Sequence, residues 1–151
     1  MVRLIDLLKK GGIILELKAK EKVEAIKELA GVLIEKELIT DAQTFFQEIL
    51  KRENLESTGI GMGIALPHAR SPAVKELVVV FGRSEEGVDF SSLDQKPSHL
   101  IFLIAAPEER KDEYIYTLVK ISKLLRKDDV RIALNKVKNE EEVLTIVRDY
   151  E

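Results

Sequence analysis

The sequence predicts an α/β domain in which helices and strands form layers. Two continuous apolar runs, residues 77–81 and 100–104, have the length and composition of strands that are covered on both faces. Segments with the apolar spacing of amphipathic helices both precede and follow these runs. Helices that precede and follow central strands in the sequence are typical of a sheet with helices packed against it. This pattern leaves the order of the strands in the sheet open.

The segments before the central strands are predicted in the following order. Residues 3–9 form a short helix that ends at Gly11-Gly12, and residues 13–17 form a first strand. From about residue 21 to residue 38, apolar residues recur at helical spacing: Val23, Ile26, Ala30 and Leu33. A second amphipathic helix contains Ala42, Phe45, Phe46, Ile49 and Leu50 and ends near residues 52–54. Thr40 and Gln43 have the spacing of a capping box at its start.

The segments after residue 81 are predicted to be mainly helical. Residues 89–97 form a turn-rich connection between the two central strands. A third long helix carries Tyr114, Leu118, Ile121 and Leu125, and a fourth carries Val130, Ala133, Leu134 and Val137 with Asp128 or Asp129 as its cap. A last helix begins with Asn139 and Glu142 and carries Val143, Ile146, Val147 and Tyr150.

Length and composition predict one globular domain over residues 1–151. The chain has 45% hydrophobic and 34% charged residues, which is typical of a folded soluble domain and not of a disordered one. Its net charge of −3 argues against a nucleic-acid-binding protein, which usually carries a basic face. The absence of cysteine excludes disulfides and thiolate chemistry, and it fits a cytoplasmic protein. No apolar run has the length of a membrane span or a signal peptide.

The segment STGIGMGIALPHAR, residues 57–70, differs most from a generic soluble sequence. It places three glycines at alternate positions and then a short apolar run before Pro67 and His68. Glycine permits positive φ and close backbone approach, and proline biases the residue before it to an extended conformation. The segment therefore predicts a glycine loop and a brief strand that presents His68 at its end. An imidazole near neutral pH can be a neutral nucleophile or a cation.

Nucleotide-binding interpretations of these glycines fail. A dinucleotide fingerprint requires a third glycine and a preceding strand, and a phosphate-binding P-loop requires Gly-Lys-Ser/Thr. Neither pattern is present. Two interpretations of Gly59 and Gly61 stay open: a nest of backbone N–H groups near a phosphoryl oxygen, or a tight crossing of two segments.

At these residues the chain resembles a known family. Residues 52–68, RENLESTGIGMGIALPH, are similar to the signature of the fructose/mannitol-type enzyme IIA domains of the bacterial sugar phosphotransferase system, which nitrogen-regulatory IIA proteins share. Every fixed position of that pattern is matched. Weaker similarity in the VDFSSLD and LIFLIAAPE segments extends the resemblance over nearly the whole chain.

The resemblance implies a fold and an activity. It implies a mixed sheet of about five strands with helices on both faces. It also implies that His68, through Nε2, accepts a phosphoryl group from the histidine-containing phosphocarrier protein and passes it to a sugar-specific IIB partner. In the alternative, a nitrogen-regulatory role, the phosphorylation state controls binding to regulatory proteins. Neither a nucleotide nor a metal cofactor is implied.

The residues before the glycines are candidates to support a phosphoryl group. The Arg52 guanidinium matches phosphoryl oxygens, although a cation near a helix C-terminus is favoured in any case. Ser57 and Thr58 either donate hydrogen bonds to the same oxygens or brace the turn. For Glu53 we prefer a role in holding Arg52 over contact with substrate.

Two further positions bear on the site. His99, the second of two histidines, is expected to be structural, and no carboxylates stand at a spacing that would complete a zinc site with it. Many family members carry another histidine near the start of the helix after the Ala-Pro-Glu segment, and alignment of the helix places Tyr114 there, with Tyr116 as the nearest alternative. The Tyr114 ring is expected to face the sheet. Whether it replaces that histidine functionally or packs for its ring alone stays open.

Overall fold

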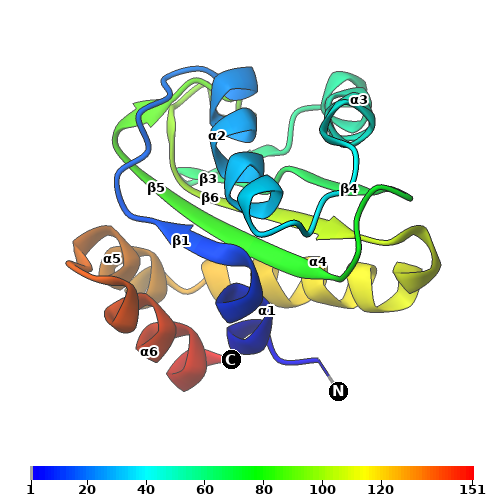
Figure 1. Cartoon of the computed structure of the whole chain (residues 1–151). Coiled ribbons are helices and arrows are strands. Elements are labelled where there is room, and N and C mark those ends of the chain that lie inside the picture. The colour runs from blue at the N-terminus through cyan, green and yellow to red at the C-terminus, as the bar shows by residue number, and fades with distance from the viewer. Residues whose placement is uncertain (1) are drawn as a thin grey trace.

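The computed structural model describes residues 2–151 as helices packed on both faces of one mixed sheet (Figure 1). Over this range the sheet has six strands in the order β1-β5-β6-β3-β2, and β4 also pairs with β6. The strands are β1 (Gly12–Ile14), β2 (Gly59–Gly61), β3 (Ile64–Ala65), β4 (His68–Arg70), β5 (Val78–Val88) and β6 (Ser98–Ala106). The predicted α/β class is confirmed. The strand number exceeds the expected five because the segment around the glycines contributes three short strands.

Two helices cover one face of the sheet and three cover the other, where a fourth, the last in the chain, packs against two of these three (Figure 1). The first pair is α2 (Lys22–Glu35) and α3 (Ala42–Leu55); the others are α1 (Leu4–Gly11), α4 (Lys111–Leu125), α5 (Asp128–Lys136) and α6 (Glu140–Tyr150). A short 3-10 turn, Glu108–Arg110, precedes α4. The helices predicted from apolar spacing are therefore confirmed as elements.

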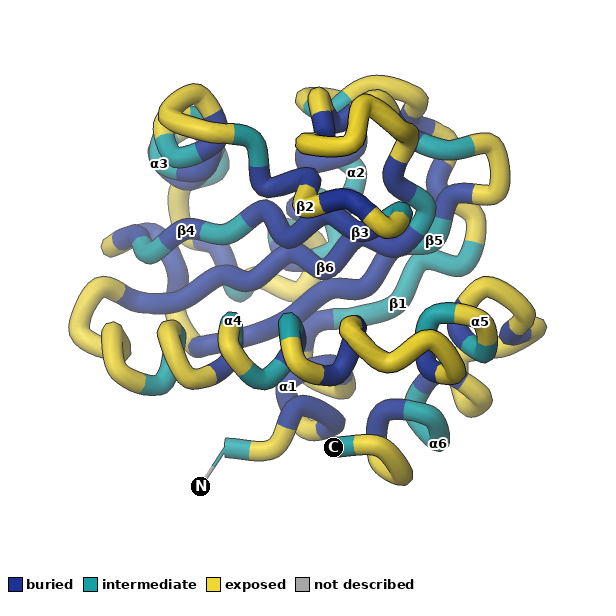
Figure 2. Tube along the Cα trace, turned by 180° about the vertical axis from the view of Figure 1, so that it is seen from behind, coloured by how far each residue is buried: buried dark blue, intermediate teal, exposed yellow. Residues whose placement is uncertain are grey.

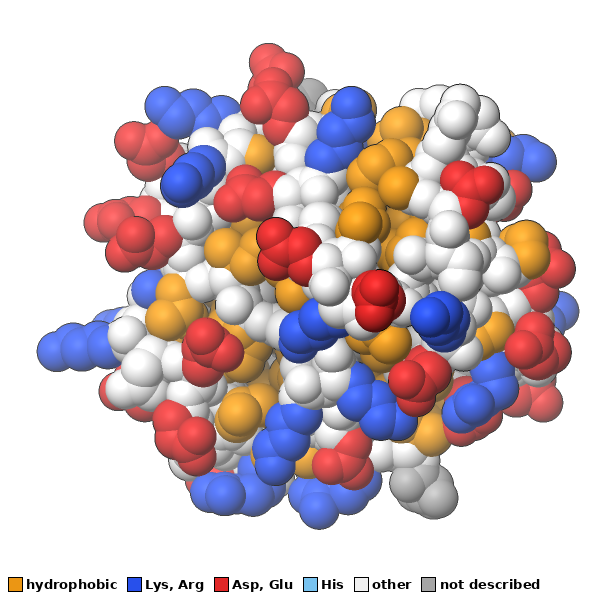
Figure 3. All heavy atoms as spheres, in the orientation of Figure 1, with side chains coloured by type: hydrophobic (Ala, Val, Ile, Leu, Met, Phe, Trp, Pro, Cys, Tyr) orange, Lys and Arg blue, Asp and Glu red, His pale blue; other side chains and the backbone are white. Residues whose placement is uncertain are grey.

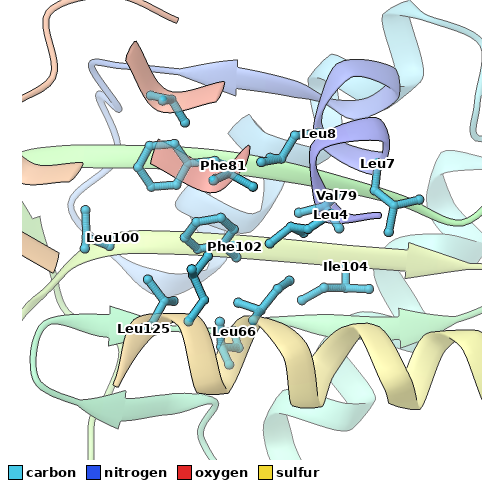
Figure 4. Packing of buried hydrophobic residues seen from close by; sticks show 14 of the residues in the cluster. Leu4, Leu7, Leu8, Leu66, Val79, Phe81, Leu100, Phe102, Ile104 and Leu125 are labelled. Atoms are coloured by element: carbon cyan, nitrogen blue, oxygen red, sulfur yellow. The ribbon is translucent and has the colours of Figure 1, made fainter. Parts of the chain in front are cut away.

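The central strands divide the core into two layers. In β5, Val79 and Phe81 point to the face covered by α1 and α4, whereas Val78 and Val80 point to the face covered by α2 and α3. Figure 4 shows the first layer, where the Phe81 and Phe102 rings meet with centroids 4.7 Å apart. The tube in Figure 2 is buried along most of β5 and β6 and exposed on the outer turns of the helices. The prediction of strands covered on both faces is confirmed.

The strand that leads to His68 is interrupted but keeps its register. Both β3 and β4 run parallel to β6: Ile64 lies opposite Leu100, and His68 lies opposite Ile104, four positions further along both strands. Between them, the Pro67 carbonyl still accepts a hydrogen bond of 3.0 Å from the Ile104 N–H. The sequence predicted that His68 stands at the end of a brief strand. In the structure it instead begins a second short strand.

Several local predictions need correction. The first strand ends at Ile14 rather than Leu17. The cap of α3 is Asp41, whose carboxylate accepts a 3.1 Å hydrogen bond from the Thr44 N–H, while the Thr40 hydroxyl donates to the Ala73 carbonyl. Neither candidate aspartate caps α5, because both already lie within its first turn and Lys127 holds the cap position.

Two further helix predictions differ from the structure, and one predicted cap is confirmed. Val23 does not belong to the buried stripe of α2, being 43% exposed, and Val137 lies just beyond the end of α5. The Asn139 cap of α6 is confirmed, since its side chain accepts a hydrogen bond from the Glu142 N–H. Capping depends on local dihedral angles that several neighbouring polar residues can satisfy, so the sequence left these choices ambiguous.

The face shown in Figure 3 carries acidic and basic side chains that are interspersed, with apolar side chains between them. This mixture agrees with the small net charge. Within residues 2–151, no helix combines the length and the apolar character that crossing a bilayer requires.

Candidate functional site

A hollow of about 330 Å³ lies beside His68, where α3, β4 and α4 come together. The packing of α3 against β4 forms one wall, and the first turn of α4 forms another. It is lined by Glu48, Lys51, Arg52, Leu55, His68, Ala69, Arg70 and Tyr114. Three segments that are distant in sequence thus meet around one imidazole.

The imidazole of His68 is held in one tautomer. Its Nδ1 lies 2.6 Å from the Leu66 carbonyl oxygen, and a carbonyl can only accept, so Nδ1 carries the proton. The neutral ring then keeps its free electron pair on Nε2. The strand is interrupted at Leu66 and Pro67, and this interruption brings the Leu66 carbonyl within reach of the ring two residues later. The backbone therefore leaves on Nε2 the electron pair that nucleophilic attack requires.

The electrostatic environment keeps this ring neutral. Burial lowers the pKa of His68 below its usual value, and the charge of Arg52 acts in the same direction. The hydrogen bond to the Leu66 carbonyl and the Glu53 carboxylate oppose these effects without reversing them. His68 is consequently neutral at pH 7, the state that a nucleophilic imidazole requires.

Arg52 lies in the last turn of α3 and lines the hollow. Its Nη1 donates a 2.8 Å hydrogen bond to the Glu56 carbonyl at the end of the same helix. One nitrogen thus satisfies a helix-terminal carbonyl, as the alternative interpretation expected. The guanidinium has further donors, and its position beside His68 suits an anion there.

The buried Glu53 and Thr58 and the half-buried Ser57 form a brace under the turn. The Thr58 N–H donates to the Glu53 carboxylate over 3.0 Å, the Thr58 hydroxyl also donates to it, and Lys22 Nζ lies 3.1 Å away. The Ser57 hydroxyl donates to the Phe90 carbonyl and accepts from the Gly59 N–H. Glu53 is thus engaged with Thr58 and Lys22 and not in holding Arg52. Both hydroxyls brace the turn.

The glycines form a tight hairpin beside the residue 89–97 connection. A Cβ on Gly59 would lie 2.3 Å from Ser92 Oγ, so only glycine fits this crossing. Gly61 has a φ of 93°, and the next N–H, of Met62, donates to the Asp94 carboxylate over 3.1 Å. Neither glycine lines the hollow at His68. These contacts favour the tight-crossing interpretation over a phosphoryl-binding nest.

Tyr114 lies in the first turn of α4, with its ring centroid 5.9 Å from that of His68. The ring faces the β4 edge of the sheet and is half-buried. Burial raises the pKa of Tyr114 to about 12, although Arg70 and Arg52 act against this shift. The phenol therefore stays protonated at neutral pH and acts beside His68 as a neutral group.

The sequence interpretation missed Arg70, Lys51 and Glu48, which also line the hollow. Arg70 was detectable, since residues two apart on a strand point to the same side and it follows His68 by two. The other two precede Arg52 by one and four positions in α3. Their proximity to His68 depends on how the helix is rotated against β4, which the local sequence does not encode.

The second histidine lies at the other end of β6. His99 is half-buried, and its Nδ1 is 2.8 Å from the Ser84 carbonyl oxygen, which ties β6 to β5. It borders a separate polar hollow of about 680 Å³. Five positions separate it from Ile104, the partner of His68 in the sheet. His99 therefore takes no part in the His68 site.

The chain is similar to known proteins over nearly its whole length. Residues 6–150 match the model of the family described as "Phosphoenolpyruvate-dependent sugar phosphotransferase system, EIIA 2". The chain is 37% identical over 150 residues, 99% of its length, to the fructose-specific EIIABC component of Bacillus subtilis, of which it spans only 24%.

Two solved structures are also similar. The nitrogen regulatory protein IIA-Ntr from Neisseria meningitidis superimposes with a TM-score of 0.86 at 31% identity, covering 95% of this chain and 97% of that one. Enzyme IIA-mannitol from Escherichia coli, solved in complex with phosphorylated IIB-mannitol, gives 0.78 at 27% identity, with 93% and 95% covered. The family model matches nearly all residues of the chain, and the matching fold holds a neutral histidine. The chain therefore belongs to the EIIA type-2 family of the phosphoenolpyruvate-dependent sugar phosphotransferase system.

Proposed function

We propose that the protein is a phosphocarrier that accepts a phosphoryl group on Nε2 of His68 and passes it to a second protein. The observation that carries the proposal is the hydrogen bond from Nδ1 to the Leu66 carbonyl, which leaves Nε2 as the free nucleophile beside the Arg52 guanidinium. The donor is the histidine-containing phosphocarrier protein. The acceptor is a sugar-specific IIB domain, and the relay operates in the cytoplasm.

The transfer needs no net proton uptake in this scheme. The P–N bond of the donor phosphohistidine breaks as the bond from phosphorus to Nε2 of His68 forms. The donor ring, protonated on its other nitrogen, leaves as neutral imidazole, and His68 becomes an imidazolium that keeps its Nδ1 proton in the hydrogen bond to Leu66. In the second step the bond from phosphorus to Nε2 breaks as a bond from phosphorus to a nucleophilic atom of the acceptor forms, and His68 returns to the neutral ring. The positive charge of Arg52 offsets the charge of the phosphoryl oxygens during both steps. The chemistry therefore requires correct placement and electrostatic stabilisation, and neither a nucleotide nor a metal takes part.

The proposal is tested by following a labelled phosphoryl group through the chain. Incubation with the phosphorylated carrier protein should give an acid-labile adduct, and addition of a fructose-type or mannitol-type IIB domain should remove the label from it. A chain that takes up no label from the carrier would overturn the relay.

A nitrogen-regulatory role is the second candidate, favoured by the likeness to the meningococcal IIA-Ntr protein. In that role the phosphoryl group on His68 changes which protein the domain binds, and no IIB acceptor follows. Label that reaches His68 but passes to neither IIB domain would support this role over sugar transport. Neighbouring reading frames for IIB and IIC domains would support transport.

Arg52→Lys should slow phosphoryl transfer by about tenfold, because lysine keeps the charge but loses the planar fork that binds two oxygens at once. The melting temperature should change little, since a lysine amine can still reach a helix-terminal carbonyl. Stopped-flow or quench-flow transfer rates, measured beside thermal melts, give both quantities. Unchanged rates with a lowered melting temperature would assign Arg52 a structural role only.

Tyr114→Phe should slow transfer several-fold, in keeping with the loss of one hydrogen bond of about 1–2 kcal/mol to the phosphoryl group. The ring and its packing are retained in this variant, so a role in packing alone predicts the wild-type rate at every pH. Tyr114→His should add a pH dependence between about pH 6 and pH 7, since histidine gains charge there and tyrosine does not. Transfer rates from pH 5.5 to 8.5 for the three proteins test this prediction.

A further inference from the structure

The proposed relay assigns no role to Arg70, whose side chain also lines the hollow beside His68. It lies on β4 two residues after His68, and both side chains are half-buried while Ala69 between them is buried. Alternate residues of a strand project to the same side. Arg70 and His68 therefore emerge side by side from the sheet edge into the same hollow.

The Arg70 guanidinium is held in place by two contacts. Its Nη1 donates a 2.9 Å hydrogen bond to the Glu108 carbonyl, just before α4. Its Cζ lies 5.9 Å from the centroid of the Tyr114 ring, which in turn lies 5.9 Å from the centroid of the His68 ring. The side chain thus has a defined position before any ligand arrives. A guanidinium that uses one nitrogen for such anchoring keeps other N–H groups for an anion.

Arg52 reaches the hollow from a different element than Arg70 does. It projects from the end of α3, whereas Arg70 projects from β4 and is anchored beside the start of α4. The remaining charged groups of the hollow, Lys51 and Glu48, both come from α3 and offset one another in formal charge. A dianionic phosphoryl group on His68 would then be matched by the two arginines.

We propose that Arg70 is a second phosphoryl-binding residue, which acts with Arg52 on the phosphoryl group carried by Nε2 of His68. This inference rests on the proposed relay and adds a residue to it. Because Arg70 is part of the strand that carries the nucleophile, its position relative to the phosphorus is fixed by the strand and not by the packing of α3. It therefore stabilises the phosphorylated state itself, whichever protein delivers or removes the group.

The test uses the full chain phosphorylated chemically with phosphoramidate, whose P–N bond breaks with release of ammonia as the phosphohistidine forms. Phosphorus NMR then follows the phosphohistidine signal as a function of pH, and the signal lost in His68→Ala identifies the relevant group. A nearby cation favours the dianion and lowers the phosphoryl pKa. We expect Arg70→Gln to raise that pKa by about half a unit to one unit and Arg70→Lys by less.

Arg126→Gln is the matched control, because it removes the same charge from an exposed position at the far end of α4. Its phosphoryl pKa should equal that of the wild type. At equilibrium with the phosphorylated carrier, the ratio of phosphorylated to unphosphorylated chain should also fall about three- to tenfold in Arg70→Gln, as a pKa change of that size requires.

The outcomes separate the inference from the relay on which it rests. If wild-type His68 carries phosphate and Arg70→Gln has the wild-type phosphoryl pKa, Arg70 only ties β4 to the segment before α4, and the inference is wrong. In that case the substitution Arg70→Gln should change only the melting temperature of the protein. If wild-type His68 takes phosphate neither from phosphoramidate nor from the carrier, the relay and the inference fall together.

Discussion

His68→Ala should abolish formation of the acid-labile phosphoryl adduct. The expected loss is complete, because alanine provides no nucleophile and the other imidazole of the chain, His99, lies at the far end of β6. The free energy of unfolding should change little, since the His68 side chain is half-buried and the hydrogen bond of its imidazole goes to a carbonyl close in sequence. Labelling by the phosphorylated carrier and acid lability of the product measure the effect.

His99→Ala is the matched control for this experiment. It removes the same side chain from a half-buried position, so it should keep the adduct while losing the hydrogen bond to the Ser84 carbonyl. An adduct that persists in His68→Ala and disappears in His99→Ala would refute the assignment of the nucleophile.

Glu53→Ala should lower the free energy of unfolding by about 2–4 kcal/mol. The Glu53 side chain is almost fully buried, and its removal leaves the Thr58 N–H and hydroxyl without their acceptor and Lys22 without its counter-ion. An unpaired group in a buried network costs more than the average hydrogen bond contributes. Urea unfolding at pH 7 gives the difference directly.

Glu56→Ala provides the comparison, since Glu56 is an exposed glutamate three positions later. It removes the same charge and should change the unfolding free energy by less than about 0.5 kcal/mol. Equal effects of the two substitutions would show that net charge, and not the Thr58 brace, determines the result. Glu53→Gln should fall between the two, because the amide can still accept from Thr58.

The large-scale pattern of the fold was readable from the sequence. The runs at residues 77–81 and 100–104 are apolar at every position, and the structure buries them on both faces. The amphipathic helices were readable for the same reason, since the period of apolar residues is a property of the local chain. Local choices between neighbouring polar residues, such as Asp41 or Thr40 as a helix cap, were not.

The sequence also determined which residue stands at the centre of the site. Pro67-His68 after the alternate glycines predicted an imidazole presented by an extended backbone, and the structure places it at the start of β4. Tyr114 was expected to face the sheet from the first turn of its helix, and its ring does lie beside His68. These positions follow from helix and strand periodicity, which acts over a few residues.

Only the tertiary structure decided what each neighbouring residue does. Glu53 and Thr58 turned inward to bind each other, because the end of α3 packs over the turn that follows it. Arg52 and Arg70 were brought to one hollow by the packing of α3 against β4. Side-chain direction at a helix end depends on contacts between segments distant in sequence, whereas the identity of His68 as the presented group depends on the chain immediately around it.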